Sequence, residues 1–346
     1  MYVSQGIYCS KSIQMTSGQS GNMRLSIAMA TYNGADYIGE QLESLFKQTR
    51  QPHELIVCDD GSNDATLELL EEFKKRVPFA VRIFRNKENI GHERNFGKAI
   101  DLCAGDLIFL CDQDDVWFPS KLEVIEKIFR ANKNILLVVN DAEITDGYLN
   151  PTGRTVFGQS KAAGVFGQNG KSLTLGCATA FRAELRSLIS PVPALEYGHD
   201  SWIHDFTHII DGRYVLDEEL QFYRRHGKNV SNWVFDGSER ASMKAVMRPS
   251  AGKDLRPAYE KRIATLELMT VRVRDLGQEG YGKLNASTSY ANVLLELKHA
   301  ISALNNRRLI FTYGWARRKL LAIGMWSKGD YRYFLGWKSF LKDLLR

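Results

Sequence analysis

The sequence predicts an α/β fold in which a mostly parallel sheet is flanked by helices and followed by a C-terminal helical extension. Short apolar runs alternate with segments of helical periodicity over the first two thirds of the chain, a pattern typical of βαβ units. Three of these apolar runs end directly in polar clusters, as strands do at the binding edge of a parallel sheet. After residue 236 helical periodicity continues, but without polar clusters suited to chemistry.

The expected elements follow one another in the order strand, then helix. The apolar runs predicted to be strands are 25–30, 54–58, 81–84, 107–111, 135–139, 214–216 and 220–223. The segments predicted to be helices are 35–48, 65–76, 92–103, 119–131, 183–189, 198–210, 258–276 and 290–304. Residues 140–170 are rich in Gly, Asn, Thr and Ser, so we expect a long connection there.

Composition and charge divide the chain into three parts. The first 22 residues are polar and lack the apolar core of a secretory signal, so we expect a disordered leader there. Residues 23–236 form the α/β domain, and residues 237–346 the helical extension. Five cysteines without paired spacing favour reduced thiols in the cytoplasm over disulfides or a zinc site. No segment is apolar over the length that a membrane span requires.

The apolar run 107–111 ends in three carboxylates, those of Asp112, Asp114 and Asp115. Isolated carboxylates are costly to bury, but they suit the carboxyl end of a strand, where parallel sheets bind ligands. An oxygen-rich cluster fits a hard cation such as Mg²⁺ or Mn²⁺, which is often shared with substrate phosphates. A helix N-cap at Asp115 or Ser120 is the alternative, but capping needs only one carboxylate.

Two further apolar runs end in polar residues. Thr31 and Asn33 follow the first run, and Asp59 and Asp60 follow the second. All three clusters should gather along one edge of the sheet, and this convergence predicts a site, although Asn-Gly alone would be a simple turn. The Gly-x-Gly-x-x-Gly fingerprint and the Walker phosphate loop are absent, which argues against an NAD enzyme or a P-loop NTPase.

These clusters belong to an ordered set of motifs over roughly residues 24–232. The motifs are Ser26-Ile27-Ala28-Met29-Ala30-Thr31-Tyr32-Asn33-Gly34, Val57-Cys58-Asp59-Asp60-Gly61-Ser62, Asn89-Ile90-Gly91, Asp112-Gln113-Asp114-Asp115, His199-Asp200-x-Trp202 and Tyr223-Arg224-x-His226-Gly227-x-Asn229. Together they resemble the family 2 glycosyltransferases of the GT-A fold, and most closely their rhamnosyltransferase-like branch. The resemblance implies inverting transfer of a sugar such as rhamnose from a dTDP- or UDP-sugar to a glycan or lipid-linked acceptor.

The resemblance also implies which residues hold the donor nucleotide. Thr31, Asn33 and Asp60 would hold the base and ribose, with Asp59 beside them. One of the two adjacent aspartates would accept a hydrogen bond from the pyrimidine N3–H, and the sequence leaves open which. Arg94 would reach the base or a phosphate; the alternative is an ordinary solvated helix arginine.

The metal site and the catalytic base are expected on the same grounds. By similarity Asp112 would contact the ribose or a metal-bound water, and Asp114 would ligate Mn²⁺ or Mg²⁺. His226 would close over the diphosphate or the metal, unless it is a structural loop histidine. Asp200 is the expected catalytic base, with a helix cap as its alternative.

Two residues beside this base have a less specific expectation. His199 would orient Asp200 or line the acceptor site, and Trp202 belongs to the same motif on the acceptor side. Many relatives carry Glu where His199 stands, so its role stays open.

The end of the chain is basic and aromatic. From residue 305 onward it has ten basic and two acidic residues, interleaved with Trp, Tyr and Phe. Such a surface is attracted to anionic lipid, which predicts a peripheral location at the inner face of the cytoplasmic membrane. One alternative is an internal helix that packs on the α/β domain, and another is nucleic-acid binding. Nucleic acid is not an expected partner, because no nucleic-acid motif accompanies the charge.

Two other functions fit part of these features. A nucleotidyltransferase that makes a sugar nucleotide would use the same metal and diphosphate, but it would need no acceptor. A membrane-associated scaffold could keep the fold without activity, although the complete set of acidic residues argues against it.

Overall fold

The computed structural model describes residues 22–162, 174–193, 198–227, 229, 255–334 and 336–345. It consists of two compact units. Unit 1 comprises residues 1–237 and 283–287, and unit 2 comprises residues 238–282 and 288–346. The expected leader lies outside the described residues, except for Asn22.

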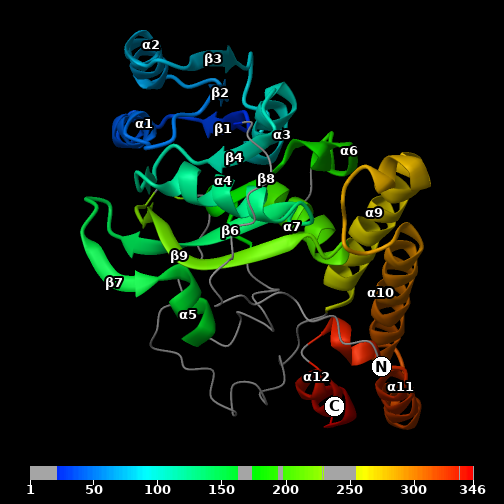
Figure 1. Ribbon diagram of the computed structural model, residues 1–346. Helices are drawn as coiled ribbons and strands as arrows, with labels where there is room; N and C mark the ends of the chain where they lie inside the picture. The colour runs from blue at the N-terminus through cyan, green and yellow to red at the C-terminus, as the bar shows by residue number, and fades with distance from the viewer. Residues whose placement is uncertain are drawn as a thin grey trace. The chain divides into compact units, whose positions relative to one another are not determined.

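Within the described residues, unit 1 is built on a nine-stranded sheet with the order β3-β2-β1-β4-β8-β6-β9-β5, and β7 pairs with β6 (Figure 1). The strands are β1 (Leu25–Thr31), β2 (Glu54–Asp59), β3 (Ala80–Arg85), β4 (Leu107–Cys111), β5 (Val116–Trp117), β6 (Leu137–Thr145), β7 (Pro151–Thr155), β8 (Thr179–Arg182) and β9 (Arg213–Arg224). The fold prediction of an α/β protein with helices around the sheet is confirmed.

The parallel part of the sheet positions the three polar clusters. Strands β3, β2, β1 and β4 run parallel, with Thr31 opposite Asp59 and Met29 opposite Cys111. The residues that follow β1, β2 and β4 therefore emerge at the same edge, as expected. Strand β8 is antiparallel to β4 and β6, while β6 and β9 pair in parallel.

Helices cover the sheet of unit 1. They are α1 (Ile38–Phe46), α2 (Thr66–Arg76), α3 (His92–Leu102), α4 (Lys121–Ala131), α5 (Val156–Ala162), α6 (Arg186–Ile189) and α7 (Gly198–Ile209). Alternate residues of β1, namely Leu25, Ile27 and Met29, join the apolar residues of α1, α2 and α4 in one buried cluster. Helix α3 packs against β1 and β2 and also contacts α7.

The expected connection at 140–170 is wrong over its described part. Strand β6 continues to Thr145, where it pairs with β9 and β7, and α5 follows. Strand pairing satisfies the backbone groups of polar residues such as Asn140 and Asp141, so their polarity did not signal a loop. Residues 163–173 lie outside the described part.

The two short strands expected at 214–216 and 220–223 are a single strand, β9. The pairing of β9 with β6 shifts register twice, beside Asn140 and Asp141. The acidic residues 217–219 lie in the part of β9 where these irregularities occur. Bulges accommodate extra residues without ending a strand. The acidic run 217–219 was therefore wrongly interpreted as a gap between two strands.

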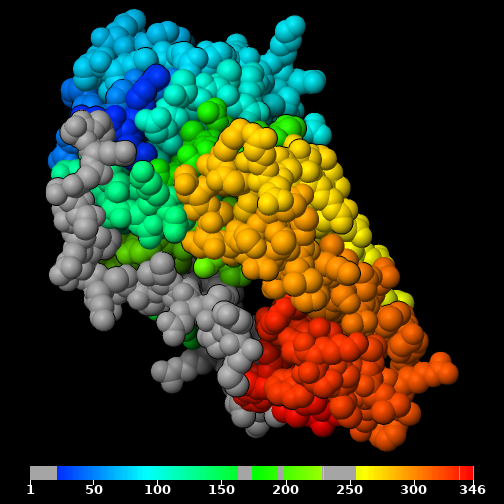
Figure 2. Space-filling model, turned by 45° about the vertical axis from the view of Figure 1, so that its right-hand side comes forward, coloured from blue at the N-terminus to red at the C-terminus, as the bar shows by residue number. Residues whose placement is uncertain are grey.

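Unit 2 is helical, and its atoms are coloured from yellow to red in Figure 2. Its described helices are α9 (Arg256–Gly282), α10 (Tyr290–Ile310), α11 (Trp315–Ser327) and α12 (Trp337–Leu345). This confirms the expected C-terminal helical region. Gly277, with φ of 68°, interrupts α9, and the Ser289 side chain accepts a hydrogen bond from the Asn292 backbone at the start of α10. None of the described helices is long and apolar enough to cross a membrane.

Part of the basic tail packs within unit 2. Arg307 of α10 is buried and lies 3.0 Å from the Asp343 carboxylate of α12, which also accepts a hydrogen bond from the Tyr331 hydroxyl. The Arg307 guanidinium lies 4.2 Å from the centre of the Phe334 ring. This arginine is therefore part of the packing within unit 2.

Candidate active site

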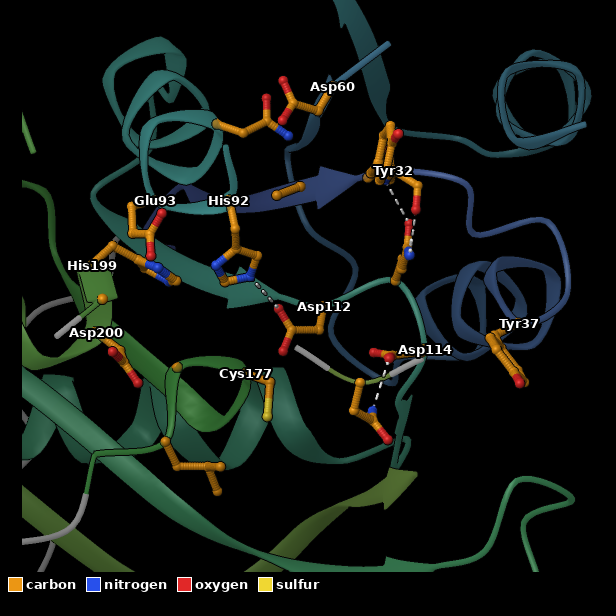
Figure 3. A pocket seen from close by; sticks show the side chains of 18 of the residues that line it. Tyr32, Tyr37, Asp60, His92, Glu93, Asp112, Asp114, Cys177, His199 and Asp200 are labelled. Carbon is orange, nitrogen blue, oxygen red and sulfur yellow. Dashed lines mark hydrogen bonds and ion pairs between the residues drawn. The ribbon is translucent and has the colours of Figure 1, made fainter. Parts of the chain in front are cut away.

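A pocket of about 980 Å³ lies at the sheet edge where β1, β2 and β4 end (Figure 3). The predicted site residues that line it are Thr31, Asn33, Asp60, Asp112, Asp114, His199, Asp200 and His226. They come from loops after three strands, from the start of α7 and from the segment after β9. Asp59, Arg94 and Trp202 were also predicted, but they do not line this pocket.

Asp59 is fully buried, and its carboxylate is used by its own chain. It accepts hydrogen bonds from the Thr31 hydroxyl at 2.9 Å, from the Ser62 backbone N–H at 2.9 Å and from the Gly61 backbone N–H at 3.2 Å. The Ser62 hydroxyl donates a further bond. The expectation that Asp59 contacts the nucleotide is therefore corrected, because it holds the turn after β2.

Asp60 faces the pocket and also orders the loop before α3. Its Oδ1 accepts from the Asn86 side chain at 2.8 Å and from the Ile90 backbone at 2.9 Å, and its Oδ2 accepts from the Gly91 backbone at 3.0 Å. Gly91 has φ of 90°, a conformation that glycine adopts without strain. Of the two adjacent aspartates, Asp60 is the one that lines the pocket.

Arg94 and Trp202 point elsewhere for reasons of helix geometry. Arg94 is exposed on α3 outside the pocket, which matches its alternative as a solvated helix residue. Trp202 is fully buried, donates its indole N–H to the Ile189 carbonyl at 2.9 Å, and packs edge-on against Phe206. It stands two residues after Asp200, about 200° around the helix, so it faces the core. The acceptor role expected for Trp202 is corrected to packing.

The acidic motif after β4 divides its three carboxylates among different partners. Asp114 Oδ2 lies 2.8 Å from His226 Nε2 and accepts from the Asn229 amide at 3.2 Å. Asp112 Oδ1 is 4.0 Å from His92 Nε2. Asp115 is buried and accepts from the Gln221 amide at 2.8 Å. Gln113, between them, binds the Tyr32 backbone through both its amide atoms and so joins this motif to the loop after β1 (Figure 3).

These carboxylates repel one another. Removal from water and the neighbouring Asp114 charge raise the pKa of Asp115 to about 7. Partial burial, followed by the charges of Asp114 and Asp115, raises the pKa of Asp112 well above its ordinary value. The buried ammonium group of Lys121 lies 4.0 Å from the centre of the Trp117 ring, and burial lowers its pKa to about 8. A divalent cation would relieve this repulsion.

The donor groups present fit such a cation. Asp112, Asp114 and His226 line the pocket together, and the two carboxylates are the ligand type that suits Mn²⁺ or Mg²⁺. Among the described residues, the ligand atoms that gather within 4.8 Å of one another are those of Asp112, Asp115 and Cys177. A thiol is a poor ligand for Mg²⁺ and Mn²⁺, so the carboxylates fit these ions better than Cys177 does.

His226 is held in place by contacts that the sequence did not indicate. The Tyr37 ring stacks on the His226 ring, with centres 4.1 Å apart and planes 15° from parallel. The Arg224 guanidinium lies 5.1 Å from the centre of the same tyrosine ring and pairs with Glu40 of α1. Tyr37 lies in the segment 35–48, which was predicted only to be a helix. No pattern in the sequence indicates that it contacts His226, 189 residues further along the chain.

Asp200 lies at the end of the pocket opposite Tyr37 (Figure 3). Its Oδ1 accepts a hydrogen bond from the Ser201 backbone at 2.7 Å, and burial raises its pKa. The backbone approaches it closely: a Cβ atom on Gly176 would lie 3.4 Å from the Asp200 Cβ.

His199, His92 and Glu93 also line the pocket at this end. His199 is buried and stacks on Phe96 of α3, with ring centres 4.2 Å apart. His92 and Glu93, at the start of α3, line the same end but were not predicted. They follow Asn89-Ile90-Gly91 directly, and that motif was the signal that could have indicated them.

Part of the chain is similar to known proteins. Residues 26–188 match the model of the glycosyl transferase family 2. An uncharacterized glycosyltransferase, alr2836 of Nostoc sp., is 26% identical over 220 residues, which cover 60% of this chain and 66% of that protein. The dTDP-rhamnosyl transferase RfbG of Shigella flexneri is 37% identical over 99 residues, which cover 28% of this chain and 34% of RfbG.

Among solved structures, S. aureus TarS 1-349 in complex with UDP-GlcNAc is similar, with a TM-score of 0.50 and 19% identity. The match covers 83% of this chain and 73% of TarS 1-349, and it shows a common fold. The curated relatives are matched over less than two thirds of their own length, 66% and 34% for the two named above. The family match supports the enzyme class expected from the sequence. Residues 26–188 therefore match the glycosyl transferase family 2, and the protein has an α/β fold of the GT-A type.

Proposed function

We propose that the protein is a metal-dependent inverting glycosyltransferase that moves a sugar from a nucleotide-diphosphate sugar to a glycan or lipid-linked acceptor. One observation carries this proposal: a single pocket is lined both by the acidic pair Asp112 and Asp114, which follows β4, and by Asp200, at the start of α7. This is the layout that an inverting displacement needs, with a leaving-group site and a base on opposite sides of the reacting carbon.

The donor nucleotide is assigned to the end of the pocket formed after β1 and β2. Thr31, Asn33 and Asp60 line it there, and Asp60 is the acceptor available to a pyrimidine N3–H. A dTDP- or UDP-sugar is the donor we propose, with rhamnose as the transferred sugar. The similarity to the rhamnosyl transferase RfbG supports rhamnose, although it covers 34% of that protein.

Asp112, Asp114 and His226 would hold the cation, Mn²⁺ or Mg²⁺. When bound, the cation supplies Lewis-acid stabilisation of the negative charge on the departing nucleoside diphosphate. The Tyr37 stack and the Asn229 contact keep His226 beside Asp114. Positioning these groups before the reaction lowers the cost of assembling them around the substrate.

Asp200 is the base in this mechanism. Its carboxylate takes the proton of the acceptor hydroxyl while the oxygen attacks the anomeric carbon, and the bond between that carbon and the diphosphate oxygen breaks. Attack from the side opposite the leaving group inverts the anomeric configuration. Burial raises the pKa of Asp200 towards the range in which a carboxylate is an effective base.

Product analysis tests this function against its rivals. The protein is incubated with Mn²⁺ and dTDP-rhamnose, UDP-glucose or GDP-mannose, together with a lipid-linked glycan extract, and sugar transfer and released nucleoside diphosphate are measured. A glycosyltransferase releases nucleoside diphosphate in step with transfer. A nucleotidyltransferase instead releases pyrophosphate from a sugar 1-phosphate and a nucleoside triphosphate, and an inactive scaffold turns over none of these substrates.

We also propose that the enzyme works at the inner, cytoplasmic face of the cytoplasmic membrane, where lipid-linked acceptors are found. Helix α11 supports this location, because Trp315, Leu320 and Ile323 are exposed there by 65%, 71% and 52%. Lys319 lies over the Trp315 ring at 4.1 Å, within a region rich in basic residues. Exposed apolar and aromatic groups beside lysine and arginine are typical of helices that lie in an anionic lipid surface.

Vesicle sedimentation tests this location. Changing Leu320 and Ile323 together to Ser should weaken binding to phosphatidylglycerol vesicles several-fold, since each side chain loses apolar contact with lipid. Leu295→Ser on α10 is the matched control, because that leucine is similarly exposed at 49%. Equal vesicle binding by the double variant and wild type would show that α11 does not contact the membrane.

A further inference from the structure

Two histidines span the part of the pocket between the acidic motif and the proposed base. The His92 ring lies 4.0 Å from Asp112 Oδ1, and its centre is 5.0 Å from the centre of the His199 ring. His199 is the residue directly before Asp200. Figure 3 shows both rings at the same end of the pocket, with Glu93 and Asp200 beside them.

Phe96 fixes both rings. It stacks on His199 with planes 14° from parallel, and it contacts His92 edge-on with centres 4.9 Å apart. Phe96 itself is 1% exposed, so this support is part of the core. The two imidazoles are therefore held as one wall of the pocket.

His199 has hydrogen-bonding capacity that the described part of the protein does not use. It is 3% exposed, and neither Nδ1 nor Nε2 has a partner among the described residues. An unpaired buried polar group costs free energy, so a bound ligand that pairs with it gains affinity. No hydrogen bond joins His199 to Asp200 within the described residues, so the ring is not tied to the base.

The proposed reaction places the transferred sugar at this wall. The anomeric carbon must lie between the diphosphate, at Asp112 and Asp114, and the base, Asp200. His92 and His199 occupy the same interval. Resting on the proposed function, we propose that His92 and His199 bind hydroxyl groups of the transferred sugar and so determine which donor sugar the enzyme accepts.

The chemistry of the wall suits hydroxyl groups. A neutral imidazole donates one hydrogen bond and accepts another, and a sugar hydroxyl does the same. Burial lowers the pKa of His199 well below its ordinary value, which keeps the ring neutral at pH 7. A site built to bind a hydroxyl group discriminates strongly against a sugar that lacks it.

The test compares a sugar nucleotide with its own nucleoside diphosphate. Calorimetry with Mn²⁺ measures the affinities of dTDP-rhamnose and dTDP, and of UDP-glucose and UDP, for the whole protein. Wild type should bind one sugar nucleotide more tightly than its diphosphate. His199→Phe keeps a ring against Phe96 but removes both nitrogens, and it should weaken that sugar nucleotide about tenfold without changing the diphosphate affinity.

A matched control lies on the same helix. His204 is 2% exposed, does not line the pocket, and bonds to the Thr179 hydroxyl at 2.8 Å. His204→Phe makes the same chemical change away from the proposed subsite. It should leave the difference in affinity between the sugar nucleotide and its diphosphate unchanged. His92→Gln is the second test variant, because a side chain that is 38% exposed tolerates substitution without unfolding the protein.

Several results would overturn the subsite. One is an unchanged sugar-nucleotide affinity in both His199→Phe and His92→Gln; another is an equal loss for sugar nucleotide and diphosphate. A wild type that binds dTDP or UDP as tightly as both sugar nucleotides would also reject it, while leaving the nucleotide site in place. Failure to bind any of the four compounds would reject the proposed function itself, and the subsite with it.

Discussion

The turns after β2 and after β4 both begin with acidic residues, yet the structure uses them in opposite ways. After β2, the Asp59 carboxylate is buried and accepts hydrogen bonds from Thr31, Gly61 and Ser62. After β4, Asp112 and Asp114 face the pocket, and Asp112 lies beside other carboxylates. The first turn supplies donors to its carboxylate, whereas the second concentrates negative charge in a pocket.

The conformation of the first turn explains much of this difference. Gly61 has φ of 83°, which lets the chain fold back so that two successive N–H groups reach Asp59. Charge-assisted hydrogen bonds of this kind stabilise the fold and leave little capacity for a ligand. An acidic residue at a strand end is therefore a binding group only where the following turn does not use its oxygens.

The largest expected effect comes from Asp200, the proposed base. Asp200→Asn should lower kcat for sugar transfer about 10³-fold, because an amide cannot take the acceptor proton. Calorimetric affinity for the sugar nucleotide should stay within about twofold, since the base does not hold the nucleotide. Asp205→Asn, on the same helix and outside the pocket, is the control. Substantial transfer by Asp200→Asn would reject its role as base.

The pH dependence should show the same carboxylate. Because burial raises the pKa of Asp200, its base form is lost at a higher pH than for an ordinary aspartate. The rate should therefore fall as pH decreases through this raised pKa, about tenfold per pH unit below it. A pH–rate profile of kcat at saturating donor and acceptor measures this limb. A limb at the ordinary aspartate pKa near 4 would contradict the assignment.

The next largest effect is expected on the free energy of unfolding, which should differ between variants of the turn after β2 and of the turn after β4. Asp59→Ala leaves buried N–H and hydroxyl donors unpaired and should lower the free energy of unfolding by about 2–4 kcal/mol. Asp112→Ala removes a charge that its neighbours repel, so it should change that free energy by less than about 1 kcal/mol. Chemical denaturation of both variants measures the contrast, and equal losses would show that the two carboxylates are alike.

The smallest expected effect concerns the support of His226. Tyr37→Leu removes the aromatic stack and should weaken Mn²⁺ binding in the presence of UDP or dTDP by about fivefold. Tyr37→Phe keeps the ring and should retain wild-type affinity. Competition with a fluorescent metal indicator measures both values. Equal affinities for the two variants would show that the stack does not position His226.

The sequence predicted the strand-end clusters, because periodicity locates strands and parallel strands align their ends. It could not separate Asp59 from Asp60, since the assignment depends on which oxygens the turn after β2 uses. It placed Trp202 in the site by motif, whereas the phase of α7 turns that side chain into the core. Tyr37 was missed because its partner, His226, lies 189 residues further along the chain. His92 was missed although it follows the motif Asn89-Ile90-Gly91 directly.

Calorimetry of nucleotide binding with and without Mn²⁺, on wild type and Asp114→Ala, tests the central claim most directly. If the carboxylates after β4 hold the cation that binds the diphosphate, Mn²⁺ should strengthen the binding of UDP or dTDP to wild type at least tenfold. In Asp114→Ala the same nucleotide should bind with little response to Mn²⁺. An equal response to Mn²⁺ in both proteins would contradict the account.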